Sequence, residues 1–220
     1  LVDMKILLTG GGSGGHFYPI IAVVEQIEKI VIEQKYIEPN LYFMSADPFN
    51  ERMLFDHNIE FVKIPAGKMR LNSGIKNIFD SFNTAIGVVK AVFKMFSIYP
   101  DVVFGKGAYA SFPALFAARL LRVPVVIHES DSVPGRVNKW AGKFADRIAV
   151  SYSEAAKYFP KERVAWTGQP IRETIKKHPR EEAENFLHIE KNVPVMLVLG
   201  GSLGAEKIND YTFTFGLEDT

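Results

Sequence analysis

The sequence contains no cysteine, which excludes a disulfide framework, a thiolate nucleophile and a cysteine zinc site. It also has no marked excess of either charge, because 26 Lys and Arg face 25 Asp and Glu and leave a net charge of +1. No global field would therefore draw the chain onto nucleic acid, and we expect no nucleic-acid partner. No uninterrupted apolar run reaches the ~20 residues of a membrane-spanning helix. We expect any membrane contact to be peripheral.

The first residues show neither a basic region nor a small-residue cleavage site of the secretory type. Together with the absence of cysteine, this favours a cytoplasmic location. The hydrophobic fraction of 47% and the charged fraction of 23% are typical of a globular chain with a core. A length of 220 residues corresponds to about one and a half domains of typical size.

Short apolar runs alternate with longer segments of helical periodicity. The runs lie at residues 5–9, 41–45, 60–64, 101–104, 125–128, 147–150 and 193–199. This alternation predicts an α/β fold, with a Rossmann-like parallel sheet and helices on both faces. The first crossover helix is expected at residues 19–34, with Pro19 in its first turn.

The pattern changes near residue 170, where a polar stretch begins that extends to residue 192. We therefore predict a first domain at residues 1–170 and a linker at 171–192. Residues 193–220 then form the first strand and loop of a second domain. A buried parallel strand needs neighbours that the remaining sequence does not supply, so we expect this second domain to be truncated.

A glycine-rich loop, Gly10 to His16, follows the first predicted strand and precedes the first predicted helix. Exposed backbone N–H groups at a helix N-terminus can bind an anion closely. The loop also matches the dinucleotide pattern G-x-G-x-x-G, which would suit a dinucleotide-dependent oxidoreductase. The required ribose-binding acid fits poorly, because Asp47 comes later than the expected ~20 residues. A loop that only allows tight strand–helix packing remains an alternative.

His16 lies where the loop joins the helix. The helix start should lower its pKa and favour the neutral imidazole that a general base requires. The alternative is a hydrogen-bonded structural histidine.

Two further clusters follow predicted strands, one at residues 104–113 and one at 128–138. Carboxyl ends of parallel strands form the edge at which open α/β sheets bind ligands, so the three loops should converge. His128, Glu129 and Asp131 could ligate a metal in principle, but alternation along an extended segment would separate their side chains. We therefore expect no metal site.

In combination, five motifs resemble the bacterial UDP-N-acetylglucosamine:N-acetylmuramyl-(pentapeptide) pyrophosphoryl-undecaprenol N-acetylglucosaminyltransferases. They are residues 5–16, 101–109, 128–131 with Asn138, 168–172, and 200–205 with Asn209. The resemblance implies two Rossmann-like domains of the GT-B type, of which this chain holds the N-terminal, acceptor-binding domain and the start of the other.

The resemblance further implies inverting transfer of N-acetylglucosamine from UDP-N-acetylglucosamine, without a metal or other cofactor. The acceptor would be the C4 hydroxyl of the N-acetylmuramyl unit in lipid I, undecaprenyl-pyrophosphoryl-N-acetylmuramyl-pentapeptide, and the product lipid II for peptidoglycan synthesis. A non-catalytic subunit that binds the lipid acceptor for a separate donor-binding chain is the alternative.

The resemblance also assigns roles by motif position. His16 is the candidate base, with Glu129 as the second candidate. The implied substrate contacts are Ser13, Gly14 and Gly15 in the first loop, Tyr109, His128, Asp131 and Asn138 on the acceptor side, and Arg172 and Ser202 on the donor side.

The chain departs from the family pattern at several places. Ser13 replaces threonine, and Ala108 replaces the second glycine of Gly-Gly-Tyr. His-Glu-Ser-Asp at residues 128–131 replaces His-Glu-Gln-Asn, and Gly-Gln-Pro at 168–170 replaces Asn-Pro.

A lipid acceptor implies contact with the cytoplasmic face of the inner membrane. Apolar residues recur at helical spacing over residues 75–96, with several lysines nearby, as in a helix that lies on a membrane surface. An ordinary crossover helix that covers the sheet is the alternative. If the helix docks on lipid, we expect Phe79 and Met95 to be its outermost apolar residues.

Overall fold

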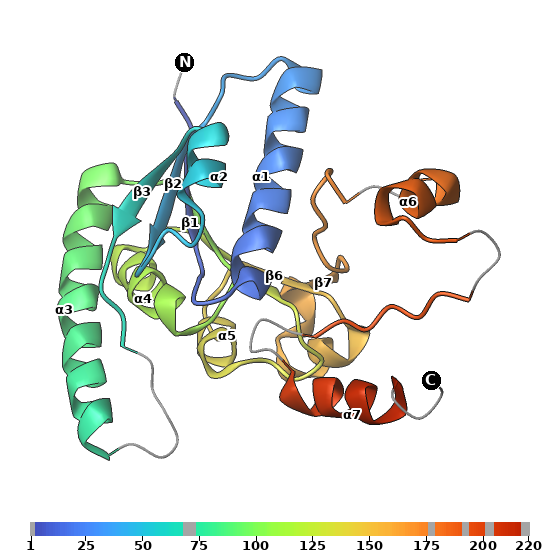
Figure 1. Ribbon diagram of the computed structural model, residues 1–220. Coiled ribbons are helices and arrows are strands. Elements are labelled where there is room, and N and C mark those ends of the chain that lie inside the picture. Colours follow the sequence, from blue (N-terminus) through green and yellow to red (C-terminus); the bar gives the residue numbers. More distant parts are fainter. Residues whose placement is uncertain (1–2, 68–73, 176–178, 191–193, 201–204, 217–220) are drawn as a thin grey trace. The chain divides into compact units, whose positions relative to one another are not determined.

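The computed structural model describes residues 3–67, 74–175, 179–190, 194–200 and 205–216. It forms two compact units, Leu1–Glu173 and Thr174–Thr220. The larger unit contains a parallel seven-stranded sheet of order β3-β2-β1-β4-β5-β6-β7 (Figure 1). Its strands are β1 (Lys5–Thr9), β2 (Asn40–Ser45), β3 (Ile59–Lys63), β4 (Val102–Gly105), β5 (Val125–Glu129), β6 (Arg147–Val150) and β7 (Val164–Trp166). The α/β class with a parallel sheet is confirmed.

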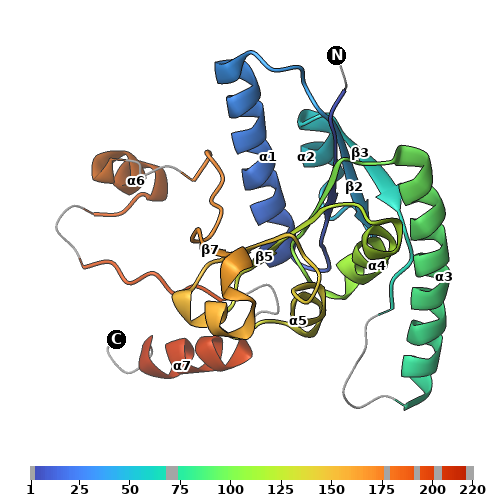
Figure 2. The same ribbon diagram turned by 180° about the vertical axis from the view of Figure 1, so that it is seen from behind.

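Helices cover both faces of the sheet, as expected (Figures 1 and 2). One layer contains α1 (Gly14–Gln34) and α2 (Glu51–Asp56), and the other contains α3 (Gly74–Ile98), α4 (Phe112–Leu121) and α5 (Arg136–Ala141). Successive strand residues point to opposite faces. Ile6 and Leu8 therefore pack with α1, whereas Leu7 packs in the opposite core cluster.

The first helix begins at Gly14, so the expectation that it starts at Pro19 was wrong. Ser13 is the N-cap, and the last two glycines of the loop already adopt helical geometry. Pro19 therefore lies beyond the first turn, where it cannot donate a helical hydrogen bond. The shift brings His16 into the first turn of α1.

The order of the strands reverses direction at β1 and β4, which are neighbours in the sheet although two strands separate them in sequence. Ligands of open α/β sheets bind outside the carboxyl ends of the strands at such a switch point. The loops that begin at Gly10 and Lys106 both start there.

The smaller unit contains α6 (Arg180–Leu187) and α7 (Glu206–Gly216). The strand predicted at 193–199 was wrong for the part that the structure describes, because residues 194–200 form neither helix nor strand. An apolar strand needs hydrogen-bonded neighbours, and Met196 and Leu197 are 81% and 76% exposed. The short strand β7 was not predicted.

Candidate functional site

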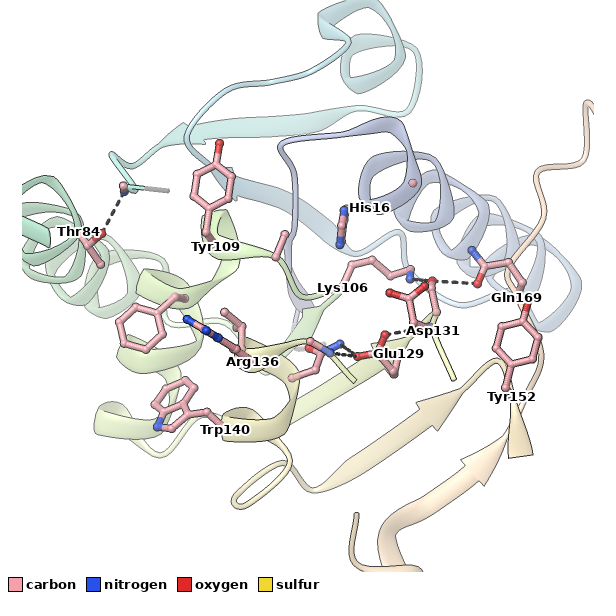
Figure 3. Close-up of a pocket in the computed structure, with 18 residues that line it drawn as sticks. His16, Thr84, Lys106, Tyr109, Glu129, Asp131, Arg136, Trp140, Tyr152 and Gln169 are labelled. Carbon is pink, nitrogen blue, oxygen red and sulfur yellow. Dashed lines mark hydrogen bonds between the residues drawn. The ribbon is translucent and has the colours of Figure 1, made fainter. Parts of the chain in front are cut away.

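A cavity of about 860 Å³ opens at the carboxyl ends of β1, β4 and β5. His16 enters it from α1, Lys106 and Tyr109 from the segment after β4, and Glu129 and Asp131 from β5 and the residues after it (Figure 3). The three predicted loops therefore meet at one cavity, where the switch point of the sheet predicts a ligand site.

The glycine loop requires glycine at two positions. Gly11 and Gly12 have φ angles of 139° and 80°, which side chains rarely adopt. A Cβ on Gly12 would also lie 2.9 Å from Cε1 of Tyr109. The Ser45 hydroxyl fixes the loop from β2 by donating to the Gly10 carbonyl at 2.7 Å. The loop is thus held beside the cavity with little side-chain cover.

His16 is held by a neighbouring hydroxyl, since its Nδ1 lies 2.9 Å from Ser13 Oγ. Burial lowers the pKa of His16, and the positive charge of Lys106 lowers it further, whereas Asp131 and Glu129 oppose the shift. The expected direction is confirmed, although burial rather than the helix start is the main cause. If Nδ1–H donates to Ser13, Nε2 keeps the lone pair that a base needs.

Glu129, the second candidate base, is buried and accepts three hydrogen bonds. Its Oε1 accepts from the backbone N–H of Asp131 at 3.0 Å. Its Oε2 accepts from the N–H of Gly135 at 3.2 Å and from the Asn138 side-chain amide at 2.9 Å. Asn138 also donates to the His128 carbonyl at 3.1 Å. These bonds tie the segment after β5 to the start of α5.

His128 is 2% exposed and does not line the cavity. Its Nε2 lies 3.0 Å from the Gly168 carbonyl, while its buried Nδ1 has no hydrogen-bond partner in the described part of the chain. Burial lowers the pKa of His128 to about 4, with Lys106 as the second cause. The ring is therefore neutral near pH 7 and donates through Nε2 to the carbonyl. This geometry links β5 to the turn at Gly168.

Lys106 was not among the predicted site residues. It is 2% exposed, lines the cavity, and donates from Nζ to Ser130 Oγ. Burial lowers its pKa to about 8, opposed by Glu129 and Asp131. The available signal was a lysine between two glycines directly after a strand.

The segment after Lys106 is tightly constrained. Gly107 has φ 84°, and a Cβ there would lie 2.9 Å from Asn138 Nδ2. Ala108 has φ 65° and ψ 167°, a conformation essentially reserved for glycine that costs on the order of 1–3 kcal/mol. This strain sets the direction in which Tyr109 leaves the backbone.

An aromatic wall, missed by sequence reasoning, forms the apolar side of the cavity. Phe112 and Trp140 line it with ring centroids 4.9 Å apart, and Phe116 stacks on Trp140 at 6.3 Å. These residues lie on α4 and α5, where a helical pattern cannot distinguish a cavity wall from core. The cavity thus has polar and aromatic sides.

The predicted site residues fall into three groups. Those that line the cavity are Gly15, His16, Tyr109, Glu129, Asp131 and Asn138. Ser13, Gly14, His128 and Arg172 form the second group and do not line it; the guanidinium carbon of Arg172 lies 4.1 Å from the centroid of the Tyr18 ring. Ser202 lies outside the described residues. Over the described ranges, no three His, Asp or Glu side chains are grouped for metal binding.

Comparison with known proteins agrees with the fold. The model of the glycosyltransferase family 28 N-terminal domain matches residues 6–150. The chain is 40% identical over 206 residues to UDP-N-acetylglucosamine--N-acetylmuramyl-(pentapeptide) pyrophosphoryl-undecaprenol N-acetylglucosamine transferase 2 of Bacillus anthracis. It is 37% identical to the corresponding transferase of Clostridium perfringens. These matches cover 94% of this chain but only 57% and 56% of the relatives.

Among solved structures, Acinetobacter baumannii MurG matches with a TM-score of 0.59 and 26% identity, covering 80% of this chain and 48% of that one. A UDP-N-acetylglucosamine 2-epimerase from Listeria monocytogenes matches with a TM-score of 0.58 but only 14% identity, over 84% of this chain and 52% of that one. The second match concerns the fold alone. Together they place the larger unit among GT-B-like N-terminal domains.

Proposed function

The chain belongs to glycosyltransferase family 28, and from this premise we propose that it is the acceptor-binding half of an N-acetylglucosaminyltransferase. The donor is UDP-N-acetylglucosamine and the acceptor is lipid I, whose C4 hydroxyl on the N-acetylmuramyl unit receives the sugar to give lipid II. The observation that carries the proposal is the cavity at the switch point, where His16 lies beside the glycine loop.

The proposed chemistry is a single displacement with inversion at the anomeric carbon. The acceptor O4 forms a bond to C1 of the donor sugar while the bond from C1 to the UDP oxygen breaks. His16 Nε2 takes the hydroxyl proton, because the lowered pKa keeps the imidazole neutral and Ser13 orients it. Glu129 keeps the loop in place, since its oxygens accept hydrogen bonds from two backbone N–H groups and the Asn138 amide.

The two compact units, Leu1–Glu173 and Thr174–Thr220, are the observation behind a proposed division into domains. We propose an acceptor domain at residues 1–170, a linker at 171–192 and the first part of a donor domain at 193–220. Arg172 and Ser202 would contact the donor.

The experiment is a transfer assay with UDP-N-acetylglucosamine and a soluble lipid I analogue. The 220-residue chain should show no turnover, because uniting both substrates supplies several kcal/mol of the barrier reduction. The same chain should transfer the sugar once it is joined to the part of the Bacillus anthracis relative that the match does not cover. Efficient turnover by the chain alone would contradict its role as one half. Acceptor binding without transfer by the joined protein would favour the non-catalytic subunit.

We also propose that α3 docks on the cytoplasmic face of the membrane. No helix in the described ranges is both long and apolar enough to cross a bilayer. The exposed face of α3, however, has a row of apolar residues three or four positions apart: Phe79, Phe82, Ile86, Val89, Phe93 and Phe96. Lys90 and Lys94 lie on the same helix and are exposed. A lipid-linked acceptor stays in the bilayer, so the cavity must be brought to it.

Met95 does not belong to this row, and the expectation that it is outermost was wrong. It is 0% exposed and packs with Ala91 in the core beneath α3, whereas Phe79 is 68% exposed. Helical spacing alone could not decide which side of a largely apolar helix faces the sheet.

The double substitution Phe79→Ser and Phe93→Ser should leave the free energy of unfolding nearly unchanged, because both rings are about 70% exposed. It should reduce co-sedimentation with anionic vesicles. Lys90→Glu with Lys94→Glu should weaken binding further, by about 1 kcal/mol per lysine, and more so at low salt. Met95→Ser is the matched control and should lower stability by a few kcal/mol. Unchanged vesicle binding in both double variants would reject the docking face.

A further inference from the structure

Lys106 is the first member of a hydrogen-bonded chain along the cavity. Its Nζ donates to Ser130 Oγ, and Ser130 donates to Gln169 Oε1 at 2.9 Å. Ser151 donates to the same Oε1 at 2.7 Å. A hydroxyl has one hydrogen. Ser130 donates it to Gln169 and accepts a hydrogen bond from Lys106 through a lone pair. The arrangement therefore suits a charged ammonium group at Lys106.

The ammonium group is only partly satisfied. It has three hydrogens, and Ser130 is its single hydrogen-bond partner in the described part of the chain. Glu129 is already occupied by three donors, and Asp131 is exposed. Neither carboxylate forms an ion pair with Lys106 within the described ranges. Burial of an ammonium group with N–H donors that lack acceptors costs free energy. A ligand that supplies acceptor oxygens would lower this cost.

The position of Lys106 indicates which ligand group that is. Its backbone N–H donates to the Thr9 carbonyl at 2.8 Å, and a Cβ on Gly10 would lie 3.1 Å from Lys106 Cβ. The lysine therefore lies against the glycine loop, from which α1 begins. Figure 3 shows its side chain in the cavity beside His16 and Asp131. A lysine next to a glycine loop at a helix N-terminus is a combination that binds phosphate oxygens.

We propose that Lys106 binds the diphosphate group of the lipid-linked acceptor and that Ser130 and Gln169 hold it in position. The proposal rests on the proposed function and adds to it a binding residue. Ser130 bonds both to Lys106 and to Gln169. The two side chains thus form one hydrogen-bonded support for the lysine.

Calorimetric titration of the 220-residue chain at pH 7 with farnesyl diphosphate, a water-soluble prenyl diphosphate, tests the proposal. Lys106→Met, which keeps the length of the side chain, should weaken binding at least tenfold. Ser130→Ala should weaken it several-fold, because the ammonium group loses its support. Lys29→Met, which removes an exposed lysine near the other end of α1, should bind like the wild type. Equal affinity of wild type and Lys106→Met would overturn the proposal.

A thermal melt of each variant verifies folding. Lys106→Met should melt no lower than the wild type, since it removes a desolvated charge. The wild-type affinity should also fall as the pH rises from 7 to 9, because Lys106 loses its proton near pH 8, while Lys106→Met should show no such fall. A wild-type affinity that does not change over this range would contradict a charged lysine in the site.

The diphosphate could also come from the donor nucleotide. UDP should therefore bind weakly to this chain and show no loss in Lys106→Met. A Lys106-dependent UDP complex would overturn the assignment to the acceptor. These titrations need no catalysis, so a failure of transfer in the joined protein would refute the proposed function without affecting them. Conversely, normal transfer with unchanged farnesyl diphosphate binding in Lys106→Met would refute only the role of the lysine.

Discussion

Replacement of His16 by alanine, in a protein that carries both halves of the enzyme, is expected to lower kcat by about 10²–10⁴. The KM for the donor should change little, because His16 lines the cavity that we propose for the acceptor. Steady-state kinetics with UDP-N-acetylglucosamine and a soluble lipid I analogue would measure both. A loss smaller than tenfold would return His16 to the role of a structural histidine bonded to Ser13.

The pH dependence gives the same prediction a second readout. The pKa of His16 is lowered by burial and by Lys106, so the neutral base persists below the ordinary value of 6.5. The decline of kcat/KM on the acid side should accordingly have its midpoint below pH 6.5. A midpoint above 6.5 would contradict this environment for the base.

Ser13 supplies the matched control. Ser13→Ala removes the hydroxyl that holds Nδ1 and should reduce kcat, because the ring loses the partner that fixes its tautomer. Ser13→Thr keeps a hydroxyl at the same position, so it should keep most of the activity. If His16 acts as base without help from Ser13, kcat should be equal in Ser13→Ala and Ser13→Thr.

The sequence predicted the fold well, because alternating periodicity reports directly on burial. Ile6, Leu7 and Leu8 form a continuous apolar run only because both faces of β1 are covered. The approach failed at residues 193–199, where composition favours a strand but the described residues have no strand beside them. A segment forms a strand only where a neighbouring strand can pair with its backbone N–H and C=O groups, whatever its own composition.

The site was predicted in outline, because topology alone brings loops after parallel strands to one edge. Which side chains enter the cavity depends on individual turns. Ala108 at φ 65° directs the chain between Lys106 and Tyr109, and nothing in the residue pattern indicates that conformation. For the same reason Lys106 was overlooked, since only packing decides that Lys106 lines the cavity and that His128 does not.

Glu129→Gln is expected to destabilise the 220-residue chain by about 2–4 kcal/mol. The carboxylate accepts from two backbone N–H groups and one amide, and a glutamine must turn its own N–H₂ group towards some of these donors. Each buried donor left without an acceptor costs about 1–3 kcal/mol. Urea unfolding monitored by circular dichroism would measure the difference.

Asp131→Asn is the control, because it removes the same charge from an exposed carboxylate two residues away. It should change the free energy of unfolding by less than about 0.5 kcal/mol. In the protein that carries both halves, Glu129→Gln should raise the KM for the acceptor as the segment between β5 and α5 loosens. A base at Glu129 would instead lose kcat while the stability of the variant stayed at the wild-type value. The stability of Glu129→Gln and its effect on kcat and KM together decide between a positioning role and a role as base.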